Sequence, residues 1–119
     1  MILVDSSVWI DFFNGADTAE VDLLSDGLGL RPVAIGDLML AEVLQGFRKD
    51  KDFRTALELF DSVTVLNLAG REIAIQAAKN FRKLRAKGYT VRKTIDSVIA
   101  TYCIVHKLPL LQNDLWGGV

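Results

Sequence analysis

Four short, largely apolar segments alternate with stretches of helical periodicity, and this alternation constrains the fold more than any other feature. The segments span residues 2–5, 33–35, 63–68 and 109–112. Continuous apolar runs are typical of strands buried on both faces, and parallel strands need crossover connections that are usually helical. The pattern therefore predicts an α/β chain in which helices cover both faces of a small four-stranded parallel sheet, a three-layer α/β/α arrangement.

The helices expected between these strands have recognisable start and stop signals. Ser6 or Ser7 is expected to cap the first helix, Asp17 or Thr18 the second, and Asp37 the third. Asn14-Gly15 should end the first helix and Gly88 should end the long helix that begins near residue 70. Further helices are expected over 50–61 and 94–107. A chain of 119 residues fits a single domain, 1–119.

Carboxylates stand at the ends of expected strands and inside apolar helices. Asp5 ends the first strand and Asp114 follows the fourth, while Glu42 and Asp96 lie in helices rich in apolar residues. Ligand sites of parallel sheets lie beyond the carboxyl ends of the strands, where these acids would gather and repel one another. A divalent cation would relieve that repulsion, and oxygen-only ligands point to Mg²⁺ or Mn²⁺. Such sites are typical of phosphodiester hydrolysis.

Each acid also has a purely structural interpretation that the sequence leaves open. These are a helix cap for Asp5, an ion pair with Arg48 or Lys49 for Glu42, a helix-dipole contact for Asp96, and a turn for Asp114. A small phosphatase or phosphoacceptor of similar fold is a further alternative. Such phosphatases usually carry a second acid two residues after the first, where this chain has Ser7.

Charge is divided unevenly along the chain, although the net charge is only −1. Up to Glu42 there are eight acids and one base, whereas residues 79–93 contain seven bases and no acid. This basic block is either a solvated helix face or a surface that meets phosphates. The bases are Lys79, Arg82, Lys83, Arg85, Lys87, Arg92 and Lys93.

Several classes of protein are disfavoured by what the chain contains. A single cysteine, Cys103, cannot form an internal disulfide, and with one histidine, His106, it cannot build a structural zinc site. No apolar run is long enough to span a bilayer and no signal peptide is evident, so a cytoplasmic protein is expected. The apolar cluster at residues 9–13 is expected to be mostly core, and any exposed remainder would suit a partner or a homodimer.

Three stretches of the sequence, in order, resemble the motifs of PIN-domain ribonucleases, and especially of the VapC toxins of bacterial toxin–antitoxin pairs. They are ILVDSSVWIDFF, IGDLMLAEVLQGF and TIDSVIATYCIVHKLPLLQND. The resemblance implies an Mg²⁺- or Mn²⁺-dependent endoribonuclease that a VapB antitoxin neutralises and that commonly forms homodimers. By motif position, Asp5 and Asp96 match the main metal ligands, Glu42 and Asp114 the other two acids, and Ser7 a hydroxyl that supports the first acid.

The chain departs from this family after the fourth motif. Family members typically continue with an Arg-Asp-Phe-like stretch, a last helix and a last strand, whereas here Asp114 is followed by LWGGV. We therefore expect that helix and edge strand to be missing. The favoured function is an endoribonuclease toxin whose RNA contacts include Arg82, Lys83, Arg85, Arg92 and Lys93. The alternative is a catalytically inactive or weakened PIN scaffold that binds an antitoxin or itself.

Overall fold

The computed structural model describes residues 1–89 and 94–113, which fall into two compact units. The first unit runs from Met1 to Leu66 and includes the segment that begins at Pro109. The second unit runs from Asn67 to Leu108. The single domain expected over residues 1–119 stays a prediction.

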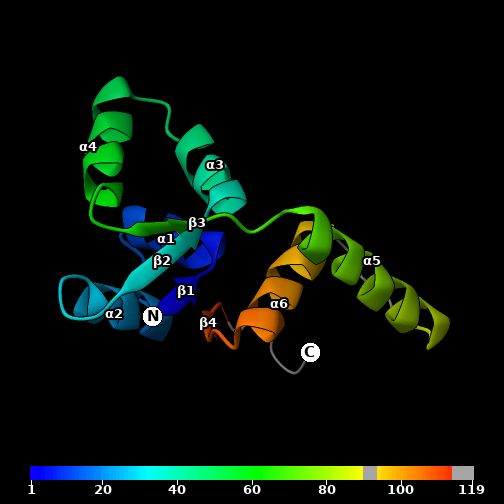
Figure 1. Ribbon diagram of the computed structural model, residues 1–119. Helices are drawn as coiled ribbons and strands as arrows, with labels where there is room; N and C mark the ends of the chain where they lie inside the picture. The colour runs from blue at the N-terminus through cyan, green and yellow to red at the C-terminus, as the bar shows by residue number, and fades with distance from the viewer. Residues whose placement is uncertain (90–93, 114–119) are drawn as a thin grey trace. The chain divides into compact units, whose positions relative to one another are not determined.

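A four-stranded parallel sheet forms the centre of the first unit (Figure 1). Its strands are β1 (Ile2–Val4), β2 (Val33–Gly36), β3 (Thr64–Leu66) and β4 (Leu110–Leu111). They lie in the order β3-β2-β1-β4, with Ile2 opposite Val33, Leu3 opposite Leu110, and Ala34 opposite Thr64. All four expected strands are confirmed, and so is the mixed α/β fold class.

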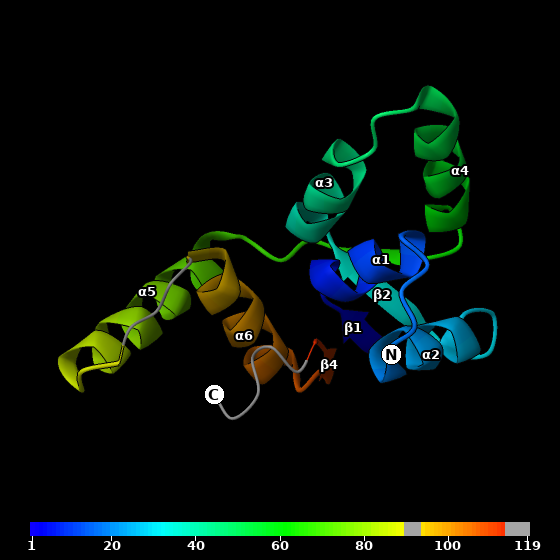
Figure 2. The same ribbon diagram turned by 180° about the vertical axis from the view of Figure 1, so that it is seen from behind.

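Four helices connect the first three strands of this unit: α1 (Ser6–Phe13), α2 (Ala19–Gly27), α3 (Asp37–Gln45) and α4 (Asp50–Phe60). The chain passes from β1 to β2 and then to β3 in one direction across the sheet, and right-handed crossovers in one direction place their helices on the same face. Consistent with this, α1 packs against α2 and α3, and α3 packs against α4. Figure 2 shows α1 in front of β2.

The helix starts are partly as expected. Thr18 caps α2, since its Oγ1 accepts a hydrogen bond from the amide of Val21 at 3.1 Å. The cap of α1 is Asp5 rather than Ser6 or Ser7, which already belong to the helix. The prediction that Asp37 caps α3 was also wrong. Asp37 is the first residue of α3, and Gly36, in extended conformation, is the N-cap. Gly15, with φ +72°, follows the end of α1 as predicted.

The core of the first unit combines β1 and β2, whose residues are mostly buried, with a cluster of aromatic rings; β3, expected to be buried, is instead mostly exposed. The ring of Trp9, which is fully buried, lies 5.0 Å from that of Phe60, and the rings of Phe13 and Phe47 are 5.2 Å apart. Ile10 is 40% exposed, so the apolar cluster of α1 is mostly core, as expected, with one side chain left at the surface. This cluster fixes α1 against α4.

The second unit consists of two packed helices, α5 (Arg71–Ala86) and α6 (Thr94–His106). Asn80 donates a hydrogen bond to the hydroxyl of the buried Thr101 at 3.2 Å, and Ser97 donates one to the carbonyl of Ala77 at 3.3 Å. Gly88 has φ +87° just after the end of α5, as the sequence predicts. In the described part of the chain, no helix is long and apolar enough to cross a membrane.

Candidate active site at the carboxyl edge of the sheet

Asp5 lies where β1 ends and α1 begins, and its carboxylate is held by the residue two positions later. Oδ2 of Asp5 accepts a hydrogen bond from the hydroxyl of Ser7 at 2.6 Å and another from the amide of Ser7 at 3.3 Å. Both bonds use the same oxygen. Among the described residues, Oδ1 of Asp5 takes part in no hydrogen bond or ion pair. The carboxylate is therefore oriented by Ser7 and keeps one oxygen available for a ligand.

Glu42 is joined to the same turn through Ser6. The hydroxyl of Ser6, which is buried, donates a hydrogen bond to Oε2 of Glu42 at 3.2 Å. Glu42 lies on α3, the helix that follows β2, and is half-buried. Its Oε1 likewise has no hydrogen bond or ion pair within the described residues. The ion pair with Arg48 or Lys49 that the sequence left open is not found among those residues.

The two acids come together because of the sheet topology. β1 and β2 are neighbours and parallel, so their carboxyl ends, and the helices that begin there, share one edge of the sheet. Consecutive serines then connect the acids: Ser7 to Asp5 and Ser6 to Glu42. Ser7 was predicted as a support of Asp5, whereas the supporting role of Ser6 was not predicted. Local pattern gives no signal for this role, because the bond joins residues 36 positions apart.

The other two expected acids are placed differently. Asp96 is half-buried in the first turn of α6, in the second unit. Asp114 lies outside the described residues, as do Arg92 and Lys93. Within residues 1–89 and 94–113, no three His, Cys, Asp or Glu side chains form a group that could hold a metal ion. The four-acid pocket stays a prediction, of which the structure brings together Asp5 and Glu42.

Comparison with known proteins decides the family. A family model described as the PIN domain matches residues 2–115. The chain belongs to the PIN domain family. The resemblance found in the motifs is thus confirmed over nearly the whole length of the sequence.

Two curated relatives of this PIN domain are similar along different lengths. VapC ribonuclease Mb1587 of Mycobacterium bovis is 29% identical over 117 residues, which cover 96% of this chain and 87% of that protein. Ribonuclease VapC32 of Mycobacterium tuberculosis is 42% identical over 77 residues, which cover 60% of each chain. Both relatives carry the name of VapC ribonucleases, the group that the motifs of this chain resemble.

Solved structures agree with the fold of this PIN domain. A toxin–antitoxin complex from Klebsiella pneumoniae has a TM-score of 0.74 at 20% identity, covering all of this chain and 92% of that chain. DNA-bound VapBC from Salmonella typhimurium has a TM-score of 0.72 at 19% identity, covering 97% and 89%. At these identities the likeness concerns the fold.

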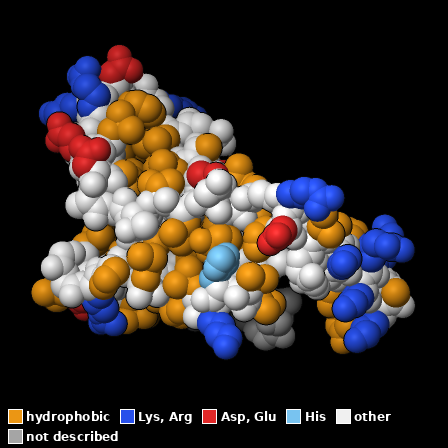
Figure 3. All heavy atoms as spheres, in the orientation of Figure 1, with side chains coloured by type: hydrophobic (Ala, Val, Ile, Leu, Met, Phe, Trp, Pro, Cys, Tyr) orange, Lys and Arg blue, Asp and Glu red, His pale blue; other side chains and the backbone are white. Residues whose placement is uncertain are grey.

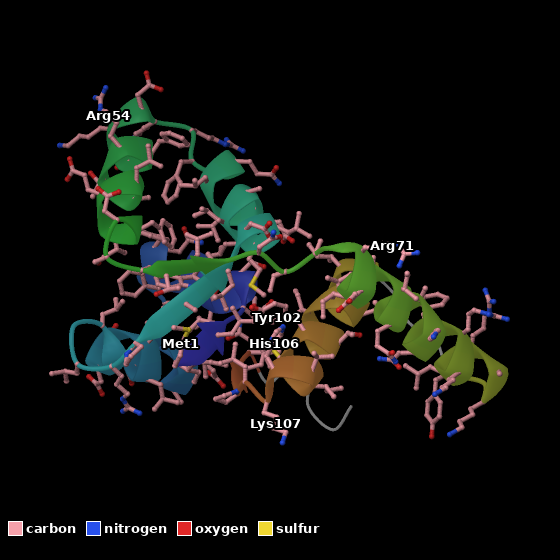
Figure 4. The ribbon with its side chains drawn as sticks, viewed as in Figure 1. Met1, Arg54, Arg71, Tyr102, His106 and Lys107 are labelled. Atoms are coloured by element: carbon pink, nitrogen blue, oxygen red, sulfur yellow. The ribbon has the colours of Figure 1, made fainter. Side chains whose placement is uncertain are left out.

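Two titratable side chains of α6 have surroundings that the structure describes: His106 contacts an aromatic ring and Cys103 is partly buried. The ring of His106 lies 4.3 Å from that of Tyr102, one helical turn earlier (Figure 4). Burial raises the pKa of the Cys103 thiol above its usual range, so the neutral thiol is favoured. Neither observation assigns a catalytic role to these residues of the PIN domain.

The predicted RNA-contacting side chains that the structure describes are on α5. Arg82, Lys83 and Arg85 are all exposed in the last turns of this helix. The guanidinium of Arg85 lies over the ring of Phe81, 5.7 Å from its centroid. No hydrogen bond within the described residues occupies these cations, so they are available to a ligand in solution.

Proposed function

We propose that this PIN domain is a metal-dependent endoribonuclease, the toxin of a VapBC-type toxin–antitoxin pair. The observation that carries the proposal is the linked pair of carboxylates at the carboxyl edge of the sheet, each held by one serine and each with one oxygen left without a partner in the described residues. The curated relatives named as VapC ribonucleases support the reaction and the substrate class.

The donor set of this edge fits Mg²⁺ or Mn²⁺. Both ions prefer carboxylate oxygens, and Oδ1 of Asp5 and Oε1 of Glu42 are such donors on neighbouring elements. We propose that Asp96 and Asp114 complete the ligand set, as the motif order implies. When bound, the ion would supply Lewis-acid polarisation of the scissile phosphate.

The residues of the chain have distinct tasks in this proposal. Ser7 fixes the rotamer of Asp5, and Ser6 fixes that of Glu42, so both carboxylates face their ligand without reorganisation when RNA binds. We propose that Glu42, on α3, accepts a hydrogen bond from the attacking water and orients it. Preorganisation of this kind lowers the barrier because no hydrogen bond has to be rebuilt during the reaction.

The proposed partners follow from the relatives. Structural neighbours are described as a toxin–antitoxin complex and as VapBC bound to DNA, which supports a VapB-type antitoxin as the protein partner. A homodimer remains part of the proposal because Ile10 of α1 stays exposed. The proposed site of action is the cytoplasm, where the RNA substrate is found.

A cleavage assay tests the proposed function. Purified full-length protein is incubated with total cellular RNA in Mg²⁺, in Mn²⁺ and in chelator, beside Glu42→Gln and Glu58→Gln. Glu58 is an exposed acid of α4 and serves as a matched control. We expect discrete products that require metal, persist in Glu58→Gln and disappear in Glu42→Gln. No cleavage under any metal, from protein shown to be folded, would favour the inactive scaffold that binds an antitoxin or itself.

A further inference from the structure

We infer that one face of α5 binds the sugar–phosphate backbone of RNA. This α5 basic face consists of Lys79, Arg82, Lys83 and Arg85. The inference rests on the proposed ribonuclease function and adds to it the surface that would hold the substrate. Figure 3 shows Lys and Arg side chains gathered on the part of the surface formed by α5.

Helical spacing separates this face from the packing face of α5. Lys79, Arg82 and Lys83 are three and four residues apart and so lie on one side of the helix. The side that packs on α6 instead carries Ala77, which is buried, and Asn80, which is hydrogen-bonded to Thr101. The hydrogen bond and the buried side chain that mark the contact with α6 thus lie on residues of α5 other than the cations.

Within the described residues, no carboxylate balances the positive charge of this face. In the sequence, no acid occurs between Glu72 and Asp96. Within the part of the chain that the structure describes, no carboxylate pairs with any of the four cations. Like charges one turn apart on a helix repel each other, so an external anion would stabilise this arrangement.

The helix dipole accounts for only part of the cluster. Lys83 and Arg85 lie in the last turn of α5, where cations are favoured by the carbonyl end of the helix. Lys79 and Arg82 lie earlier, beyond the last turn over which this effect acts. Their presence on the same face needs another explanation, and a phosphate backbone supplies one.

The shape of the face suits a chain of phosphates better than a single one. A hollow of about 470 Å³ is lined by the four cations together with Ala86. From Lys79 to Arg85 the cations extend over roughly 9 Å of helix axis, at 1.5 Å per residue. A small phosphate ester would reach only part of this length, whereas a nucleic-acid strand would pass along it.

The test measures RNA binding without cleavage. Fluorescence anisotropy of a labelled single-stranded RNA of mixed sequence is recorded in chelator for the full chain, for Arg82→Gln/Lys83→Gln and for Lys51→Gln/Arg54→Gln. Lys51 and Arg54 are exposed on α4 and give the same change of net charge on a different helix; Figure 4 shows the Arg54 side chain pointing outward from α4.

We expect the α5 variant to bind RNA at least about fivefold more weakly than the α4 variant, whatever the base sequence. The slope of log affinity against log salt should become less steep by about 1.4, since each lost phosphate contact on a single strand accounts for about 0.7. The α4 variant should match the unsubstituted chain. If the double variant of α5 does not fold, as judged by circular dichroism, the single variants Arg82→Gln and Lys83→Gln carry the test with half the expected change in slope.

Binding and cleavage fail separately, so the two proposals can be told apart. RNA that is cleaved by the unsubstituted chain but bound equally well by the α5 variant would overturn the role of this face and leave the ribonuclease standing. An equal loss in the α4 variant would also overturn it, because only net charge would then matter. Binding that depends on α5 without any cleavage would support the face and remove the proposed activity.

Discussion

Replacing Asp5 with asparagine should separate the two roles that its carboxylate can have. The side chain caps α1 by accepting hydrogen bonds from the amide and hydroxyl of Ser7 at 3.3 and 2.6 Å. An asparagine carbonyl can accept both bonds, and Asn caps helices about as well as Asp. Loss of the charge beside the helix N-terminus should cost about 0.3–1 kcal/mol of the free energy of unfolding.

Asp5→Ala removes the cap as well as the charge. Loss of a cap costs about 1 kcal/mol, so the total loss in the free energy of unfolding should be about 1.3–2 kcal/mol. At this chain length, 1 kcal/mol corresponds to about 3–6 °C in Tm. We therefore expect Asp5→Asn to lower Tm by only a few degrees and Asp5→Ala to lower it clearly more, while both lose RNA cleavage by at least about 100-fold, because either removes a proposed metal ligand.

Thr18→Ala is the matched control for this comparison. Thr18 caps α2 through a bond of 3.1 Å to the amide of Val21, so its loss should also cost about 1 kcal/mol. Cleavage per folded molecule should nevertheless be unchanged. Thermal unfolding followed by circular dichroism, together with initial rates at a temperature where all variants are folded, supplies both numbers. Full activity in Asp5→Asn would refute the reasoning and leave Asp5 as a helix cap only.

Three further changes address other contacts of the first unit and of α6. Ser6→Ala removes the donor to Glu42 and should lower kcat for RNA cleavage about 10-fold or more, with little change in KM; an unchanged kcat would mean that Ser6 does not position the acid. Phe60→Ala removes one ring from the aromatic cluster and should lower the free energy of unfolding in urea by about 3–5 kcal/mol. The exposed Leu57→Ala should lower it by only about 0.5 kcal/mol, and similar losses for both would contradict the packing described. The Cys103 thiol should react with iodoacetamide more slowly at pH 8 in the folded than in the urea-unfolded chain, because a raised pKa leaves less thiolate; equal rates would speak against its burial.

Short strands and the first acid were accessible from the sequence because both depend on local pattern. The apolar run before Asp5 indicates a strand followed closely by a helix start, and the structure has β1 and α1 there, with Asp5 rather than a serine as the cap. The cap of α3 was missed because Gly36 and Asp37 differ by one residue, and local pattern does not fix a helix start to that accuracy. The signals for α5 and Gly88 were again local.

The bond between Ser6 and Glu42 could not be predicted in the same way. It joins residues 36 positions apart and depends on the register of β1 against β2, with Ile2 opposite Val33, and on the rotation of α3. A single sequence gives the periodicity of α3 but not which of its faces meets α1. Glu42 was therefore recognised as an acid in apolar company, while its donor was not.

The short helix α1 ties the carboxylate edge to the most deeply buried ring of the unit. The amides of Val8 and Trp9 donate hydrogen bonds to the carbonyl of Asp5 at 3.1 and 3.3 Å, and the side chains of both residues are fully buried. Their amide hydrogens can exchange with solvent only when this part of the core opens. The turn that holds the acids should thus belong to the same cooperative unit as the core, so that heat or denaturant abolishes the site and the fold together rather than loosening the site first.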